Sequence, residues 1–184
     1  MRTRLLRLAA PSLLLLAGCQ SVATRGTPFT AVPGFGAAVD VPAAASPRGS
    51  RIAVRAVFPA TRAAASPDKV LPALDKAARY LNLLALQGVR AAPGDVVVVV
   101  SGPATPAVLT DPAYRNRNPS VASNPNLPPI RALALAGATV RVCGQALHAQ
   151  GIAASEVAPG VRQDLSAMTA LVELQSRGHA LIPE

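Results

Sequence analysis

The chain has 184 residues, of which 51% are hydrophobic and only 3% aromatic, and its formal net charge is +9. Its core must be built from Val, Leu, Ile and Ala, a composition typical of a buried parallel sheet covered by Ala-rich helices. The basic residues are spread along the chain and are not interleaved with aromatic residues, so nucleic-acid binding is not expected.

The first 18 residues have the pattern of an export signal. Three arginines precede an apolar segment around residues 13–16, which is too short for a permanent membrane span. The sequence L-A-G-C at residues 16–19 resembles the lipobox of bacterial lipoproteins, in which the cysteine is acylated after cleavage in front of it. The resemblance predicts removal of residues 1–18 and lipidation of Cys19. The alternative is an ordinary signal peptide with an incidental cysteine.

The lipobox resemblance implies a lipid-anchored protein on the periplasmic side of a bacterial cell envelope. Gln20 stands where an aspartate usually retains lipoproteins in the inner membrane, which implies sorting to the outer membrane. If Cys19 is acylated, Cys143 is the only remaining thiol and no disulfide can form within one chain. The Cys143 thiol is then either buried and inert, joined to another chain by a disulfide, or a reactive group.

Residues 19–50 are rich in Pro and Gly and show little periodicity, which predicts a tether between the lipid and a globular domain at residues 51–184. The first strand of that domain is predicted from Arg51 to Phe58, where alternation stops at Pro59. A helix is predicted after Ser66-Pro67-Asp68, delayed by Pro72, with apolar residues on one face and its end at Gly88.

The clearest strand runs from Asp95 to Val100, because five consecutive valines indicate burial on both faces of a central parallel strand. Ser101 follows at its carboxyl end, and Thr105 to Leu109 is predicted to start a short helix. Residues 112–129 are polar and rich in Pro and Asn, which predicts a long loop. A helix is predicted from Ile130 to Ala136.

The remaining elements follow in the same alternation. We predict a strand at 138–143, one or two helical turns at 147–150 and a short strand within 157–163. A helix capped by Asp164 or Ser166 then ends near Arg177, and a last strand follows at 179–182. Four or five strands alternate with helices, which predicts an α/β fold: a three-layer parallel sheet with helices on both faces and right-handed crossovers.

Cys143 is the candidate reactive residue. It ends a predicted strand, and reactive sites in parallel α/β sheets collect at the carboxyl ends of strands. The backbone N–H groups of the helix that follows favour a thiolate, whereas burial among Val140, Val142 and Leu147 opposes it.

Several segments resemble one family in their order and spacing: Tyr80 to Leu83, Asn124 to Leu127, Val142 to Leu147, Ser166 to Gln175, and G-H-A-L-I-P at 178–183. This is the DsrE/DsrF-like sulfur-relay family, and the resemblance covers about residues 50–184. It implies a flavodoxin-like α/β fold, assembly into trimers or hexamers, and transfer of sulfur as a persulfide on a cysteine after a strand. Cys143 is the only position that matches that role. Residues 33–36, P-G-F-G, also resemble a lead-in segment of exported members.

One departure from the family affects this site. Related sequences often have V-H-G after the central strand, whereas this chain has Ser101 before Gly102, so a histidine that could activate Cys143 is missing. Ser101, Gln145 and His148 are the remaining candidates to assist Cys143, although His148 is also explained as a solvated helix residue. Asn82 and His179 are expected to be structural.

No other chemistry is indicated by sequence motifs. The chain lacks a Walker loop, a G-x-G-x-x-G helix start and a G-x-S-x-G elbow, so no cofactor is expected. Two histidines and one spare cysteine do not make a zinc site.

Two functions remain open from the sequence. In the first, Cys143 accepts sulfane sulfur from a donor protein and passes it to an acceptor. In the second, the domain is a non-catalytic oligomeric envelope module that binds a partner or small ligand, and Cys143 is a small core residue. The reactivity of Cys143 in the folded protein distinguishes them.

Overall fold

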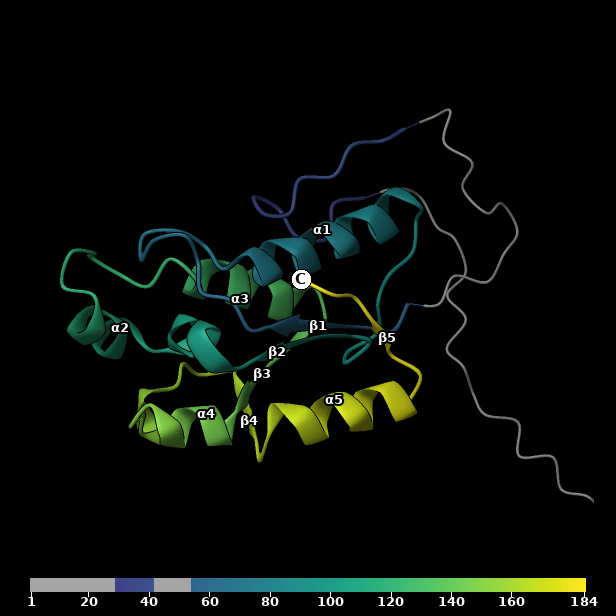
Figure 1. The fold of residues 1–184 in the computed structure, drawn as a ribbon. Coiled ribbons are helices and arrows are strands. Elements are labelled where there is room, and N and C mark those ends of the chain that lie inside the picture. The colour runs from purple at the N-terminus through teal and green to yellow at the C-terminus, as the bar shows by residue number, and fades with distance from the viewer. Residues whose placement is uncertain (1–28, 42–53) are drawn as a thin grey trace, which may run out of the picture.

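The computed structural model describes residues 29–41 and 54–184, which form an α/β domain around one parallel sheet (Figure 1). The five strands lie in the order β4-β3-β2-β1-β5. Their bounds are β1 Ala56–Ala60, β2 Val96–Val100, β3 Thr139–Cys143, β4 Arg162–Asp164 and β5 Ala180–Leu181. The predicted parallel α/β fold is confirmed. The leader, Cys19 and most of the tether lie outside the described residues, so export and lipid anchoring stay predictions.

Helices cover both faces of the sheet. On one face lie α1 (Pro72–Leu86) and α3 (Leu127–Leu135), and on the other lies α5 (Ala167–Ser176), as Figure 1 shows. Beyond the carboxyl ends of the strands lie the 3-10 helix η1 (Gly102–Val108), α2 (Asp111–Arg117), α4 (Gly144–Ala149) and the short 3-10 turn η2 (Ala154–Glu156). In the described part of the chain, no helix has the length and hydropathy of a membrane span.

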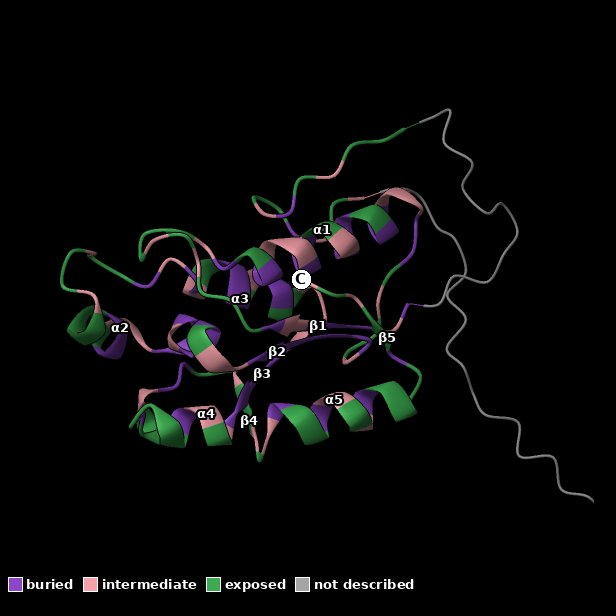
Figure 2. Ribbon diagram, in the orientation of Figure 1, coloured by how far each residue is buried: buried purple, intermediate pink, exposed green. Residues whose placement is uncertain are grey.

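The valine run forms the centre of the core, as predicted. All five residues of β2 are buried, so the sheet lies in the buried middle layer of Figure 2. Val96, Val98 and Val100 belong to the larger cluster under α1 and α3, whereas Val97 and Val99 belong to the cluster under α5. Successive residues of a strand point to opposite faces, so only a sheet covered on both sides can bury such a run.

The predicted end of the first strand at Pro59 is wrong, because β1 continues through Pro59 to Ala60. The β1–β5 pairing involves only Ala56 and Val57, and the last bond on that side runs from the Ile182 N–H to the Val57 carbonyl. Backbone groups of β1 face β2 and β5 alternately, so the nitrogen of Pro59 faces the side where β5 has ended. Its missing N–H therefore removes no ladder hydrogen bond.

The predicted loop at residues 112–129 is also partly wrong, since it contains α2 and the first turn of α3. Pro112 occupies the first turn of α2, and Pro128 and Pro129 occupy that of α3. N–H groups in a first turn have no intrahelical acceptor, so proline is tolerated there. These three prolines mark two helix starts, whereas Pro119 and Pro125 lie in turns, as the loop prediction expected.

The described residues before the sheet include a segment that lies on α1, which we call the strap (residues 29–38). Val32 is fully buried in the main core cluster, and the Phe29 N–H donates to the Ala85 carbonyl at 3.1 Å. Asn82 on α1 binds the strap backbone through five hydrogen bonds. The predicted structural role of Asn82 is confirmed.

Candidate functional site

The carboxyl ends of the central strands bring the predicted site residues into one line. Register pairs Ala60 of β1 with Val100 of β2, Val100 with Val142 of β3, and Cys143 with Asp164 of β4. Thr61 and Ser101 each come one residue after their paired strand residue. Thr61, Ser101, Cys143 and Asp164 therefore form a row along the sheet edge, the edge row, with about 4.8 Å between neighbouring strands.

Cys143 is a free thiol with 6% relative exposure. It belongs to the cluster on the α5 face, together with Val99, Ala167 and Ala170. Its backbone is extended (φ −72°, ψ 116°) and directly precedes α4. The predicted burial of Cys143 is confirmed, but the predicted neighbours are wrong. Val140, Val142 and Leu147 belong to the cluster on the other face of the sheet, because successive residues of β3 point to opposite faces.

Gly144 explains why glycine follows the cysteine. A Cβ atom at Gly144 would lie 2.8 Å from the Asp164 carbonyl oxygen and 3.3 Å from that of Leu165. The end of β4 passes so close to the turn between β3 and α4 that no side chain fits. The V-C-G sequence therefore fixes the position of Cys143 against the neighbouring strand.

The three residues predicted to assist Cys143 occupy different positions. Ser101 is half-buried and is the neighbour of Cys143 in the edge row. Gln145 and His148 are exposed on α4. Among the described residues, the structure shows no hydrogen bond between Cys143 and any of the three.

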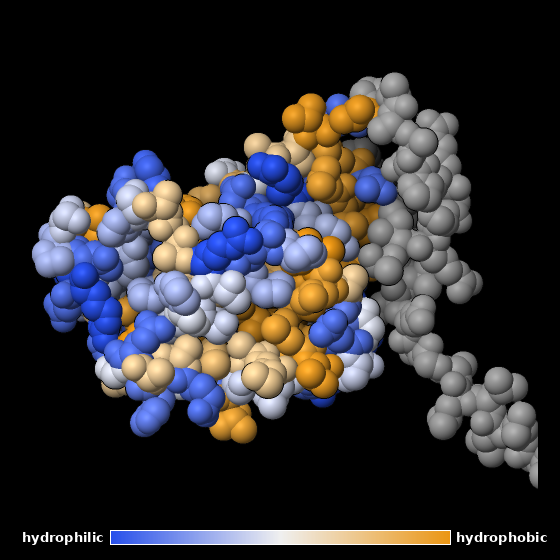
Figure 3. Space-filling view, viewed as in Figure 1, coloured by the Kyte–Doolittle hydropathy of each residue, from blue (hydrophilic) through white to orange (hydrophobic). Residues whose placement is uncertain are grey.

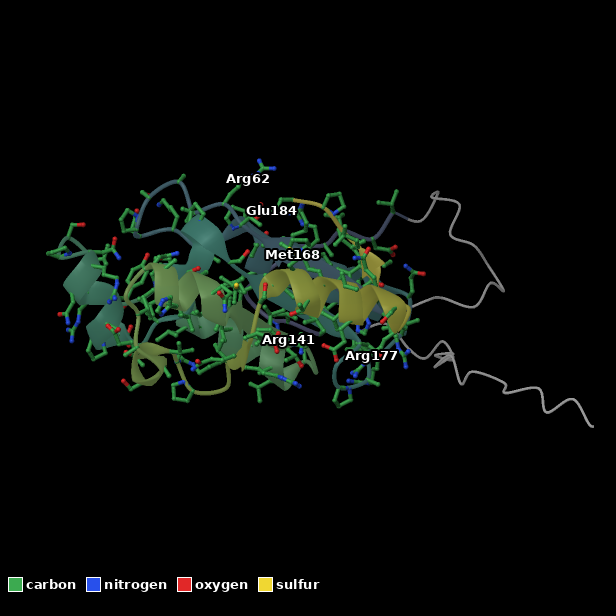
Figure 4. All side chains as sticks on the ribbon, turned by 60° about the horizontal axis from the view of Figure 1, so that its bottom comes forward. Arg62, Arg141, Met168, Arg177 and Glu184 are labelled. Carbon is green, nitrogen blue, oxygen red and sulfur yellow. The ribbon has the colours of Figure 1, made fainter. Side chains whose placement is uncertain are left out.

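A buried ion pair next to Cys143 was not predicted. Arg141 lies two residues before Cys143 on the same side of β3 and is 5% exposed. Its Nε is 2.6 Å from Oδ2 of Asp164, and its Nη2 is 2.9 Å from Oδ1. Nη2 also lies 3.4 Å from Oε2 of Glu173, which in turn pairs with Arg177 at 2.8 Å (Figure 4). Of the two predicted caps of α5, Ser166 is the one observed, since its side chain accepts the Met168 N–H. Asp164 instead pairs with Arg141.

The family-like N-P-N segment is a structural clamp. The Asn124 side chain donates to the carbonyls of Ala107 (3.0 Å) and Leu109 (2.7 Å) and accepts from the Asn126 side chain at 2.9 Å. Asn126 then accepts the Leu71 N–H at 2.7 Å. These buried amides join the loops after β1 and β2 to the start of α3.

The clamp supports an open cleft that sequence reasoning did not find. Its volume is about 390 Å³, and it lies between the β1–α1 loop, η1 and α2. Small apolar side chains line most of it, and Tyr114 and Arg117 supply polar groups. Arg117 is itself paired with Glu156 at 2.8 Å.

The histidines do not form part of a metal site in the described residues. His179 is buried, with its two ring nitrogens 3.0 Å from the carbonyls of Leu174 and Gly94, so its role is structural as predicted. Over residues 29–41 and 54–184, no group of three or more His, Cys, Asp or Glu side chains is arranged to hold a metal ion.

Comparison with known proteins gives a family match and a likeness to solved structures. A model of the DsrE/DsrF-like family matches residues 68–183. No curated protein matches the chain. Among solved structures, the chain is similar to MTH1491, a protein of unknown function from Methanobacterium thermoautotrophicum, with 22% identity and a TM-score of 0.49 over 71% of this chain and 98% of that one.

Proposed function

The chain belongs to the DsrE/DsrF-like family, and from this premise we propose that it handles sulfane sulfur through Cys143. The family indicates sulfur relay at a general level. The observation that carries the specific proposal is the position of Cys143 at the carboxyl end of β3, where the family's sulfur-carrying cysteine is expected. It is also the one free cysteine among the described residues.

The proposed step is a thiolate attack on a polysulfide. The Cys143 sulfur forms a bond to a terminal sulfane sulfur while the next S–S bond of the polysulfide breaks. The electron pair of that bond leaves with the shortened polysulfide, and Cys143 becomes a persulfide. An acceptor thiolate then takes the outer sulfur and returns Cys143 to the thiolate.

Access decides whether this step is possible, since Cys143 is 6% exposed. We propose that the six-residue α4 moves outward to admit the donor. Its outer side chains, Gln145 and His148, are exposed, and Leu147 is its one buried residue. The side chain of Gln150, directly after α4, donates a hydrogen bond to the Gly102 carbonyl at 2.8 Å. Short elements with few buried contacts are the first to open.

Polysulfide treatment followed by intact-mass analysis tests the proposal. In a Cys19→Ser background, where Cys143 is the only thiol, we expect a mass gain of one sulfur, and none after the further change Cys143→Ser. Ser101→Ala should retain the gain but slow it, because Ser101 is the neighbour of Cys143 at the edge. The proposal fails if the background variant gains no sulfur and a thiol reagent reaches Cys143 only after denaturation.

A second function, that of a non-catalytic oligomeric module, is favoured by one observation on α5. Leu165 and Met168 are each 76% exposed, and Val172 is 65% exposed. Met168 and Val172 are four residues apart and therefore share one stripe of the helix. Hydrophobic side chains reach the surface over α5 in Figure 3, and Met168 lies on this helix in Figure 4. Contiguous apolar surface of this kind marks interaction sites.

We propose that a second copy of the chain covers the α5 stripe. Val172→Glu places a charge in that interface while leaving the core unchanged, so it should convert an oligomer into a monomer, as measured by light scattering. Leu135→Glu on α3 is the matched control, because Leu135 is 91% exposed and lies on the opposite face of the sheet. A wild-type protein that is monomeric at micromolar concentration would contradict this assembly.

A further inference from the structure

A carboxylate is held at the carboxyl end of β1 by four donors. Oε1 of Glu184 accepts the N–H of Thr61 at 2.9 Å and that of Arg62 at 3.3 Å. Oε2 accepts the Thr61 hydroxyl at 2.6 Å and lies 3.4 Å from Nε of Arg62. Figure 4 shows the Arg62 and Glu184 side chains together at this edge. We call the two N–H groups, the hydroxyl and the guanidinium the β1 nest.

The nest has the chemistry of an oxyanion site. Successive backbone N–H groups form concavities that bind anions, and charge-assisted bonds from guanidinium and hydroxyl groups add to them. Burial opposes ionisation of Glu184, but the hydrogen bonds from Thr61 and Arg62 outweigh it and hold the pKa of this carboxyl below its usual value. The site therefore favours a negative charge over a neutral group.

The sheet, not Glu184, positions the backbone donors. Thr61 directly follows Ala60, whose carbonyl accepts the Ser101 N–H at 2.9 Å. Behind the nest, a Cβ atom at Gly102 would come within 3.6 Å of the Thr61 carbonyl. Because the end of β1 is paired with β2 up to Ala60, these donors should keep their arrangement when Glu184 leaves.

The nest also lies where an open sheet of this topology binds ligands. The chain proceeds from β1 through β2 and β3 to β4 in one direction, then returns through α5 to β5 on the other side of β1. Ligands of such sheets bind outside the carboxyl ends of the strands, at the point where the strand order reverses. Here that point is the end of β1, and Glu184 fills it. The open cleft begins at Ala63, immediately beyond the nest.

From this geometry we propose that the β1 nest binds a small inorganic oxyanion and that the Glu184 carboxylate occupies the site in its absence. Two strand spacings separate the nest from Cys143, a distance of about 10 Å. The proposal does not rest on the sulfur chemistry proposed for Cys143, and the two can fail separately.

Titration calorimetry on the full chain at constant ionic strength tests the proposal, with sulfate, thiosulfate and acetate as probes. Glu184→Ala removes a tethered competitor, so it should bind sulfate or thiosulfate at least about tenfold more tightly than the wild type. Adding Thr61→Val or Arg62→Ala to Glu184→Ala should reverse that gain, because each removes a donor. Acetate distinguishes recognition of any carboxylate from recognition of a tetrahedral oxyanion, and the proposal requires weaker binding of acetate.

Asp68→Ala is the matched control for net charge. Asp68 lies in the same loop, is 57% exposed and pairs with Lys69. Asp68→Ala therefore removes one negative charge, as Glu184→Ala does, but leaves the donors of the nest unchanged. It should bind sulfate and thiosulfate as the wild type does. Equal gains in Asp68→Ala and Glu184→Ala would overturn the proposal, as would the absence of saturable binding in a folded Glu184→Ala.

Discussion

Asp164→Ala is expected to lower the free energy of unfolding by about 3–5 kcal/mol, the usual cost of removing one partner from a buried ion pair. The Arg141 side chain is 7% exposed and that of Asp164 is 10% exposed. Without Asp164, the guanidinium keeps only Glu173 at 3.4 Å, a partner that is 38% exposed. A charge left in this position costs more than the pair itself contributes, because its desolvation is no longer compensated.

Chemical denaturation of matched variants measures this effect. Glu173→Ala is the control, since it removes the more exposed partner of the same arginine and should cost about 1 kcal/mol or less. The double change Arg141→Met with Asp164→Leu removes both charges, so it should be nearly neutral. If Asp164→Ala costs no more than Glu173→Ala, the ion pair does not hold β3 and β4 together.

The same variant should also affect Cys143. Asp164 is the register partner of Cys143, and its carbonyl lies against Gly144. Loosening the end of β4 should therefore open the turn that carries the cysteine. We expect Cys143 to react faster with a thiol reagent in Asp164→Ala than in the wild type under native conditions.

Local patterns predicted the parts of the fold that depend on neighbouring residues. The valine run predicted a strand buried on both faces, and Ser166 was one of two residues proposed to cap α5. Pro59 and the prolines at 112–129 misled the prediction, because proline is also compatible with a strand next to a short edge and with a first helical turn. These cases depend on what lies beside the proline in space.

The site was less predictable because its contacts join distant segments. The position of Cys143 at a strand end followed from the sequence, whereas the partner of Arg141 lies 23 residues away. Thr61 and Glu184 are 123 residues apart, and no local pattern marks either of them. An arginine in an otherwise apolar strand, T-V-R-V-C, was the one available signal that β3 has a buried charge partner.

Asn82→Ala is expected to release the strap from α1 while the rest of the domain stays folded. The Asn82 oxygen accepts the N–H groups of Ala31 (3.1 Å) and Val32 (2.8 Å), and its amide donates to three strap carbonyls. An alanine leaves these backbone groups without partners next to a buried helix face. Each net hydrogen bond contributes about 0.5–1.5 kcal/mol, so we expect the loss of all five to weaken strap docking by about 2.5–7.5 kcal/mol.

Limited proteolysis with chymotrypsin measures strap release, since the strap contains Phe35 next to Gly36. Gly36 has φ +59°, and a Cβ atom there would lie 2.0 Å from the Arg79 backbone nitrogen. Cleavage after Phe35 should therefore accelerate in Asn82→Ala and in Gly36→Ala, which disrupts the same contact from the other side. Gln87→Ala removes an amide from the end of the same helix and should cleave at the wild-type rate.

Asn82→Asp separates the donors of this contact from its acceptors. Aspartate can still accept the N–H groups of Ala31 and Val32, but it cannot donate to the carbonyls of Val32, Phe35 and Gly36 and places its negative charge against them. We therefore expect strap release at least as complete as in Asn82→Ala. Wild-type cleavage rates in both variants would contradict the role assigned to Asn82. Because the strap lies on α1 and Cys143 faces α5, sulfur uptake at Cys143 should not change in either variant.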